Sequence, residues 1–230
     1  MKNVLKIFAI FIFGMAGGIF ADQIFWPYFV ERPLLYQYGL DQPPIYVTEV
    51  REVVIRENTA LKDAVSRVEK AVVGVRTQTR AGKILEGSGL VVTSDGLLVT
   101  LAELVPAGSA FTFFVDGDSF AFQVLRRDLE NNLALVKFEG TSFTTVGFAD
   151  FEQLGLGERV FLVGGAGVVN EGTVRAFDEN SIQTNIFEEE QLSGSPLFNI
   201  EGGFLGLITV DRQGKVSATP IPKIRTFLGF

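Results

Sequence analysis

The stretch "GSGLVVTSDGLLVT", residues 87–100, places an Asp-Gly pair between two apolar runs. Asp-Gly between apolar runs is a strong β-hairpin signal, because the turn needs positive φ angles that these residues tolerate. The same signal recurs at Asp116-Gly117 in "FFVDGDSFAF", and "LFNIEGGFLGLI" offers Glu201-Gly202-Gly203. Many short strands separated by such turns predict an all-β domain, either a barrel or a sandwich.

The composition excludes several classes of function. Of the 230 residues 47% are hydrophobic and 20% charged, which is enough apolar material for a real core. The net charge of −7 argues against a nucleic-acid partner, because phosphate binding needs clustered Lys and Arg. Histidine and cysteine are both missing. Their absence excludes disulfides and thiol catalysis and argues against zinc or haem, so we expect neither a metal nor a cofactor.

Residues 1–30 resemble a membrane anchor. Lys2 and Lys6 precede an apolar run over 7–21, and Trp26 and Tyr28 follow it as an aromatic belt would. The flanking charges predict a single pass through the lipid bilayer, with the bulk of the chain outside the cytoplasm. The alternative is a signal peptide cleaved after Ala21, which would leave a secreted or periplasmic protein. A buried core helix is the third interpretation.

A linker and a helix are expected next. Residues 31–56 contain three prolines and end in "IYVTEVREVVIR", which indicates an extended stalk or a strand. Apolar residues then recur at helical spacing from Leu61 to Val72, which predicts a helix over 57–71 whose apolar stripe packs on the following domain. From residue 72 onward, short apolar runs separated by turn signals predict strands. This pattern is interrupted over 139–157, where we expect a crossover between two lobes.

Five stretches resemble, in order, landmarks of the HtrA-type branch of the trypsin-like serine proteases. They are "GSGLVVTSDGLLVT" (87–100), "RDLENNLALVKF" (127–138), "LGLGERVFLVGGAG" (154–167), "SIQTNIF…LSGSPLFNIEGGFLGLIT" (181–209) and "SATPIPKIRTFL" (217–228). The resemblance covers about residues 72–228. It implies an all-β fold of two six-stranded-type antiparallel β-barrels within a domain over 57–230. The expected parts are a first barrel over 72–140, a second over 141–220 and a terminal helix over 220–229.

The resemblance also assigns the catalytic positions. Ser193 matches the nucleophile, Glu103 stands where the family keeps histidine, and Asn132 stands where it keeps aspartate. Gln191 occupies the position of the glycine whose N–H forms half of the oxyanion hole, and Ser195 replaces the second glycine of the Gly-Gly-Pro run. The chain is expected to lack the PDZ domain common in the family.

These substitutions predict a degenerate triad. In the family mechanism, imidazole takes the serine proton and returns it to the leaving amine. A free carboxylate is about a hundredfold weaker as a base. We expect a hydrogen-bonded chain from the Ser193 hydroxyl to the Glu103 carboxylate to the Asn132 amide, with every buried polar group paired. Loss of the base and of an oxyanion donor predicts a pseudoprotease.

Weaker candidates each have a structural explanation. The run Glu188-Glu189-Glu190 could attract a basic peptide, but charge runs are usually solvated loops. Asp116 and Asp118 hint at calcium, yet the Asp-Gly turn explains them, and "GGAG" at 164–167 lacks the helix of a phosphate cradle. Five phenylalanines could form an exposed patch or fill the core: Phe111, Phe113, Phe114, Phe120 and Phe122.

Three functions therefore compete. The first is a membrane-tethered module that binds a peptide or protein along a strand edge beside the former substrate cleft. The second is a serine endopeptidase-like hydrolase in which Glu103 serves as a non-standard base for Ser193. The third is a structural domain that forms a homo-oligomer through its N-terminal segment or its Phe-rich strands.

Overall fold

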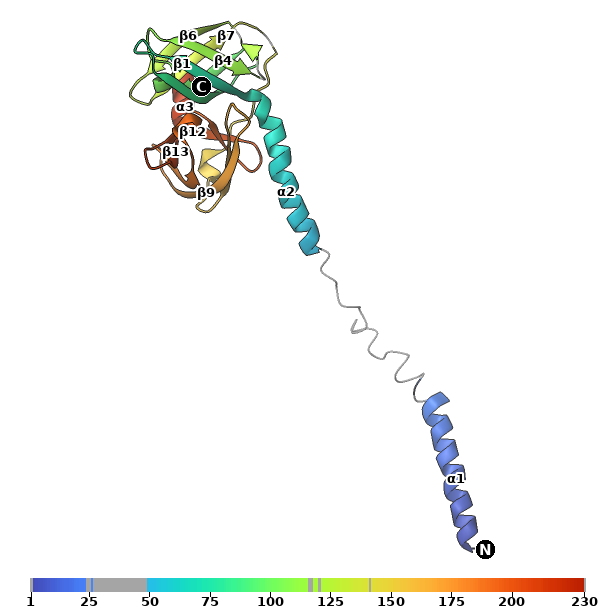
Figure 1. Ribbon diagram of the computed structural model, residues 1–230. Helices are drawn as coiled ribbons and strands as arrows, with labels where there is room; N and C mark the ends of the chain where they lie inside the picture. The colour runs from blue at the N-terminus through green and yellow to red at the C-terminus, as the bar shows by residue number, and fades with distance from the viewer. Residues whose placement is uncertain are drawn as a thin grey trace. The chain divides into compact units, whose positions relative to one another are not determined.

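The computed structural model describes residues 2–23, 26, 49–115, 118–119, 121–140 and 142–229 (Figure 1). The chain divides into two compact units, residues 1–52 and 53–230. The predicted Asp116-Gly117 turn, Phe120 and most of the predicted linker lie outside the described residues.

The first helix, α1 (Lys2–Phe20), is built from the apolar run. Residues 3–23 have a mean hydropathy of 2.2, and none of their described side chains is buried. At 1.5 Å per residue, a helix of this length spans about 30 Å, the thickness of a bilayer's hydrocarbon core. The helix is therefore long and apolar enough to cross a membrane.

The second helix, α2 (Glu49–Val68), begins earlier than predicted. The expectation of extended chain up to residue 56 is wrong for its last eight residues. Their β-branched valines favoured a strand, but Val50, Val53 and Val54 also fit helical spacing and continue the period of the residues that follow. A 3₁₀ turn (Glu69–Ala71) ends the helix. Its last turns pack on the domain, because Ala64 and Val68 are fully buried.

The first lobe is a seven-stranded antiparallel sheet with the order β5-β4-β1-β2-β3-β7-β6. Rings near the two ends of this order meet, since the centroids of Phe113 on β4, the strand next to the terminal β5, and of Phe122 on the terminal β6 lie 4.7 Å apart. The sheet therefore curls into a barrel, as expected. Its strands are β1 (Val72–Gln78), β2 (Ile84–Val91), β3 (Leu97–Leu101), β4 (Ala110–Val115), β5 (Asp118–Ser119), β6 (Phe122–Asp128) and β7 (Leu133–Phe138).

The second lobe is a closed six-stranded barrel with the order β10-β13-β12-β11-β8-β9. Between the lobes, the described residues from 142 to 158 carry a single 3₁₀ turn (Phe151–Gln153) and otherwise no regular element. The strands are β8 (Arg159–Val163), β9 (Val169–Phe177), β10 (Ile182–Phe187), β11 (Pro196–Asn199), β12 (Phe204–Val210) and β13 (Lys215–Pro220). The all-β class and the two-barrel architecture are thus confirmed.

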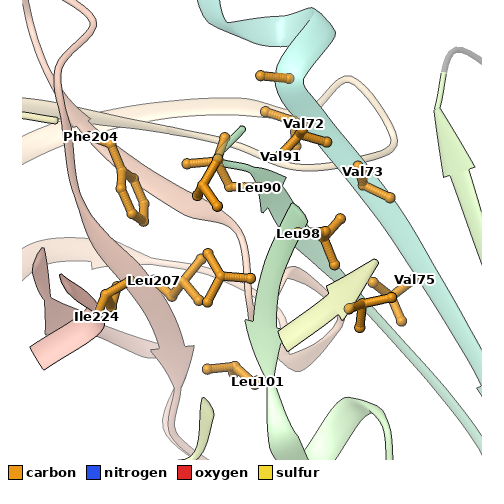
Figure 2. Close-up of a cluster of buried hydrophobic side chains, with 14 of the residues drawn as sticks. Val72, Val73, Val75, Leu90, Val91, Leu98, Leu101, Phe204, Leu207 and Ile224 are labelled. Carbon is orange, nitrogen blue, oxygen red and sulfur yellow. The ribbon is translucent and has the colours of Figure 1, made fainter. Parts of the chain in front are cut away.

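A shared core joins the lobes. Figure 2 shows Leu90 of the first sheet close to Phe204 and Leu207 of β12, and all three are fully buried in one cluster with Leu98. The terminal helix α3 (Ile221–Leu228) adds Ile224 to this cluster and packs against β12, β13 and β7. Each large apolar side chain buried in this way contributes roughly 1.5–3 kcal/mol. The lobes are therefore held in a fixed arrangement, and so are the loops between them.

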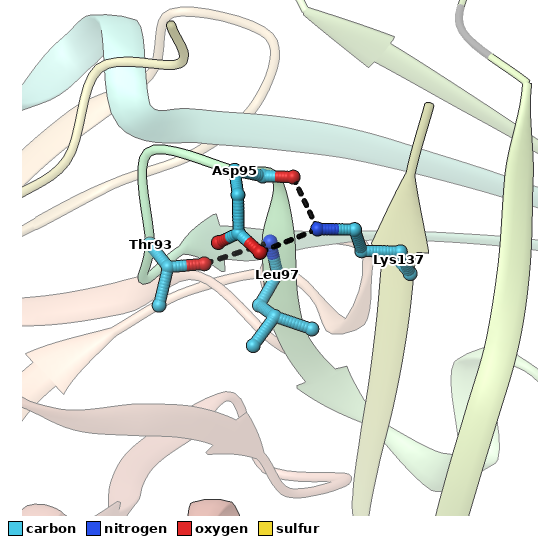
Figure 3. A network of polar contacts seen from close by, with 4 residues as sticks. All are labelled: Thr93, Asp95, Leu97 and Lys137. Carbon is cyan, nitrogen blue, oxygen red and sulfur yellow. Dashed lines mark hydrogen bonds and ion pairs between the residues drawn. The ribbon is translucent and has the colours of Figure 1, made fainter. Parts of the chain in front are cut away.

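The Asp95-Gly96 hairpin forms as predicted, with β2 and β3 antiparallel and Gly96 at φ +91. Figure 3 shows what holds this turn. The Lys137 ammonium on β7 donates to the Asp95 carbonyl at 2.5 Å and to its carboxylate at 2.6 Å, and the Thr93 hydroxyl accepts from the Leu97 N–H at 3.0 Å. The β11–β12 hairpin around Gly202 also forms.

The described phenylalanines divide between core and surface. Phe113 is fully buried, Phe111 and Phe122 are half-buried, and Phe114 is exposed. Core filling therefore explains most of this cluster, as alternation along β4 dictates. Phe114 is the described member that faces solvent.

Candidate functional site

The nucleophile loop consists of a 3₁₀ turn (Glu190–Leu192) followed directly by Ser193. Gly194 then has φ +83, and a Cβ atom at this position would lie 2.3 Å from the Ser88 carbonyl oxygen. Only glycine fits such a position. The sequence Ser-Gly therefore sets a sharp bend that seats Ser193 against β2, where its side chain is 5% exposed.

The Ser193 hydroxyl is directed at the backbone of β12. Its Oγ accepts a hydrogen bond from the Val210 N–H at 3.2 Å. The Ser193 carbonyl accepts from the Ser88 N–H at 3.0 Å. Among the described residues, no side chain forms a hydrogen bond with this hydroxyl, and the neighbouring Ser195–Ser88 hydroxyl pair does not include it. The hydroxyl therefore has no proton acceptor beside it.

Glu103 and Asn132 meet, but not as predicted. Glu103 lies in the 3₁₀ turn Ala102–Leu104, and its backbone N–H donates to Asn132 Oδ1 at 3.0 Å. The Asn132 carbonyl also accepts from the Ala102 N–H at 3.2 Å. Asn132 itself adopts φ 53, a left-handed conformation that Asn and Asp tolerate better than most residues. The asparagine therefore holds the backbone of the turn through its oxygen rather than donating its amide to a carboxylate.

The expected chain from Ser193 through Glu103 to Asn132 is wrong in its contacts. Glu103 and Asn132 are in contact, and the neighbour of Glu103, Leu104, lies with the Ser193 carbonyl around Gly87. However, the Glu103 side chain is exposed, and its carboxylate forms no hydrogen bond or ion pair in the described part of the chain. A carboxylate is better solvated by water than by one amide, which explains why it turns outward. The expectation that every buried polar group is paired is met among the described residues, because none of their buried side-chain N or O atoms lacks a hydrogen-bond partner.

The loop also withdraws an oxyanion donor. In the trypsin-like mechanism, the N–H of the nucleophilic serine and that of the residue two positions earlier bind the developing oxyanion. Here the Ser193 N–H donates to the Glu190 carbonyl at 3.0 Å, and the Leu192 N–H donates to the Glu189 carbonyl at 2.9 Å. Gln191, exposed at the matching position, lies inside this tightly wound turn. The Ser193 N–H is thus occupied within its own loop.

A buried pair of hydroxyls beside the loop was missed by sequence reasoning. Ser195 Oγ donates to Ser88 Oγ at 3.1 Å, and Ser88 Oγ also accepts from the Gly165 N–H at 2.9 Å. Ser88 and Ser195 are 1% and 0% exposed. Replacement of a family glycine by Ser195 was the available signal, because a buried hydroxyl requires a partner. These bonds tie β2 of the first barrel to the nucleophile loop and to the 164–168 turn of the second.

The remaining sequence candidates are placed as follows. The Glu188 carboxylate accepts from Asn170 Nδ2 at 2.6 Å, while Glu189 and Glu190 are solvent-exposed. In the described residues, no group of three or more acidic side chains is arranged to hold a metal ion. The 164–167 segment is a turn between β8 and β9, closed by the Gly167 N–H donating to the Gly164 carbonyl at 2.9 Å.

Comparison with known proteins identifies the family. The model for the trypsin-like peptidase domain matches residues 87–207. A probable periplasmic serine endoprotease DegP-like from Rhizobium meliloti is 32% identical over 150 residues, which is 59% of this chain and 30% of that protein. Its counterpart from Chlamydia muridarum is 27% identical over 144 residues, or 56% and 29% of the two chains. The chain belongs to the trypsin-like peptidase family, and these DegP-like members of it are similar to this chain.

Solved structures show the same fold. The HtrA-type protease AlgW, determined with a tripeptide, has a TM-score of 0.67 and 23% identity, covering 74% of this chain and 62% of that one. The matched region spans about a third of the curated relatives' length. The two barrels therefore share the fold of this solved protease.

Proposed function

We propose that this protein is an HtrA-like pseudoprotease, a membrane-tethered module outside the cytoplasm that binds a peptide or protein and does not cleave it. The contact between the Ser193 N–H and the Glu190 carbonyl carries this proposal. This hydrogen bond engages one of the two N–H donors that an oxyanion hole needs, in a loop that has no catalytic base beside it. A binding role keeps the fold and its cleft without requiring the acid–base cycle.

The magnitudes support the absence of turnover. Loss of the catalytic base costs roughly 10⁶ in rate, and loss of one oxyanion donor costs roughly 10² to 10³. Glu103 would have to replace the base, yet its carboxylate is exposed and the Ser193 hydroxyl is bonded to Val210. The alternative hydrolase would therefore need both the Glu103 side chain and the loop to rearrange before any bond is attacked.

The tether is inferred from α1. Its apolar stretch is long enough to span a bilayer, and Lys2 and Lys6 at its start favour a cytoplasmic N-terminus. The relatives named above are described as periplasmic. Both observations support a domain displayed outside the cytoplasm.

Labelling with a fluorophosphonate probe tests the proposal. We would treat the detergent-solubilised full chain, its Ser193→Ala variant and an active HtrA-type protease side by side. The expected result is equal labelling of the full chain and of the variant, at background. Labelling that depends on Ser193 and proceeds within about tenfold of the active protease would show a working nucleophile and refute the proposal.

A further inference from the structure

An acidic-rimmed groove lies beside the nucleophile loop. It has a volume of about 680 Å³ and is walled by β1, β2, β4, the 165–168 turn and the 188–192 segment. Gln191 and Leu192 line it, so it adjoins the position of Ser193. The volume falls within the range of pockets that bind small ligands, and it can accommodate several side chains of an extended segment.

The walls of the groove expose apolar side chains. Phe114 on β4 is 37% exposed and Val168 in the turn is 41% exposed, although both face the concavity that Leu192 and the buried Val75 also line. Apolar side chains around a concavity leave surface that a ligand can remove from water. One part of the ligand should therefore be an apolar side chain.

The rim of the groove is negative. Three carboxylates line it, from Glu86, Glu188 and Glu189, against the single cation of Arg76. Arg76 is already engaged, with its Nε 3.6 Å from Glu86 Oε1. The Glu188 carboxylate accepts from the Asn170 amide, which is neutral and supplies no compensating charge, and the Glu189 carboxylate has no hydrogen-bond or ion-pair partner among the described residues. Two carboxylates on the nucleophile-loop side are thus uncompensated.

We propose that this groove recognises a basic segment of another protein, with an apolar side chain against Phe114 and Val168 and a Lys or Arg beside Glu188 and Glu189. This inference rests on the proposed binding function and specifies the chemistry of its partner. The positive charge of such a segment complements the rim, and its apolar neighbour covers the exposed walls. By contrast, a larger cleft beside α3, of about 1500 Å³, is lined by side chains of both signs and offers no such complementarity.

Fluorescence anisotropy tests the inference on the detergent-solubilised full chain. The probe is a labelled peptide Gly-Ser-Leu-Phe-Lys-Arg-Ser-Gly, and the comparison peptide has Glu-Glu in place of Lys-Arg. We expect the basic peptide to bind about tenfold tighter than the acidic one, which is the effect of roughly two partly exposed ion pairs. We also expect the difference to shrink as salt is raised from 50 to 500 mM, because salt screens exposed charges.

Paired variants locate the binding. Glu188→Gln with Glu189→Gln keeps the side-chain size and removes both charges, so affinity for the basic peptide should fall about fivefold or more. Val168→Ser should weaken both peptides. The matched control is Glu152→Gln with Glu179→Gln in the mixed-charge cleft, which should change affinity less than about twofold. Unchanged thermal unfolding curves would show that each variant is folded.

The possible results separate the two proposals. If neither peptide binds, the inference fails, whereas the proposed absence of cleavage rests on the Ser193–Glu190 contact and is decided by the fluorophosphonate labelling. If both peptides bind equally, or if the Glu188/Glu189 variant binds as the parent does, peptide binding survives and the assignment of this groove is refuted. A preference for the acidic peptide would also refute it.

Discussion

At the scale of single residues, Asn132 and Ser193, two positions that the resemblance assigns to catalysis, both form hydrogen bonds with backbone groups. Asn132 caps a backbone turn through its oxygen, and Ser193 gives its N–H to Glu190 and receives one from Val210. Each group that would serve catalysis is used to hold a loop. Restoring the lost side chains therefore tests whether the loop conformation itself prevents turnover.

We predict that Glu103→His combined with Asn132→Asp does not restore full proteolytic activity. Asp tolerates the left-handed conformation at 132, so the fold should accept the change. Turnover should stay about 10² to 10³ below that of an active HtrA-type protease, because the Ser193 N–H is still bonded to Glu190. Adding Gln191→Gly should raise the rate, since glycine lets the loop re-form the hole. Casein cleavage measures this, and full activity in the double variant would contradict it.

The Ser88 hydroxyl supports a second prediction at this scale. Ser88→Ala should lower the free energy of unfolding by about 1–3 kcal/mol, because the Gly165 N–H and the Ser195 hydroxyl lose a buried partner. Ser94→Ala, an exposed serine in the adjacent turn, should change it by less than about 0.5 kcal/mol. Urea unfolding compares the two, and equal effects would show that the buried hydroxyls contribute nothing.

At the scale of elements, the β2–β3 turn depends on an ionised carboxylate. The hydrogen bond from Lys137, followed by the one that involves Thr93, holds the pKa of Asp95 below its usual value of 3.8. A lowered pKa means that folding favours the charged form, so the stabilisation is present above pH 3.8 and is lost as the pH falls through the lower folded-state value.

We therefore predict a pH-dependent effect of Asp95→Asn. The variant should unfold at a lower urea concentration than the parent at pH 7, and the two midpoints should converge below the folded-state pKa of Asp95. The carboxylate is exposed, so the difference at pH 7 should be small. Glu179→Gln serves as a control at another exposed acid. A gap between the Asp95 variant and the parent that persists at pH 2 would mean that charge is not the cause.

The same elements show what a sequence can predict. The Asp-Gly turn and the helical period over 61–72 are local signals, and both describe real elements. The predicted start of α2 was wrong because valine occurs in strands as well as in helices, and only the surrounding folded structure decides which of the two forms. The contacts of Ser193 could not be anticipated, because the choice between Val210 and Glu103 depends on side-chain rotamers and on the folded path of β12.

At the scale of the whole molecule, the proposed function depends on whether the α1 segment is retained as a membrane anchor. Retention and cleavage make different predictions for the mature chain, because cleavage after Ala21 would remove the lysines and nearly all of the apolar helix. We predict that the mature protein retains residue 2 and stays in the membrane pellet after alkaline carbonate washing. Intact-mass measurement checks the first point.

Charge placed within the helix tests the same tether without changing the length of the chain. An Arg at the centre of a membrane span costs about 2.5–3.5 kcal/mol on the insertion scale, so Ile10→Arg with Phe13→Arg should release the protein from the pellet into the soluble fraction. Both positions lie on α1 and are exposed there, which leaves the fold of the β-domain untouched. Ile10→Leu with Phe13→Leu keeps the apolar character and should stay in the pellet. If the Arg variant also stays in the membrane pellet, the domain itself binds the membrane and α1 is not the anchor. A soluble parent chain that begins at residue 22 would instead establish the helix as a cleaved signal sequence.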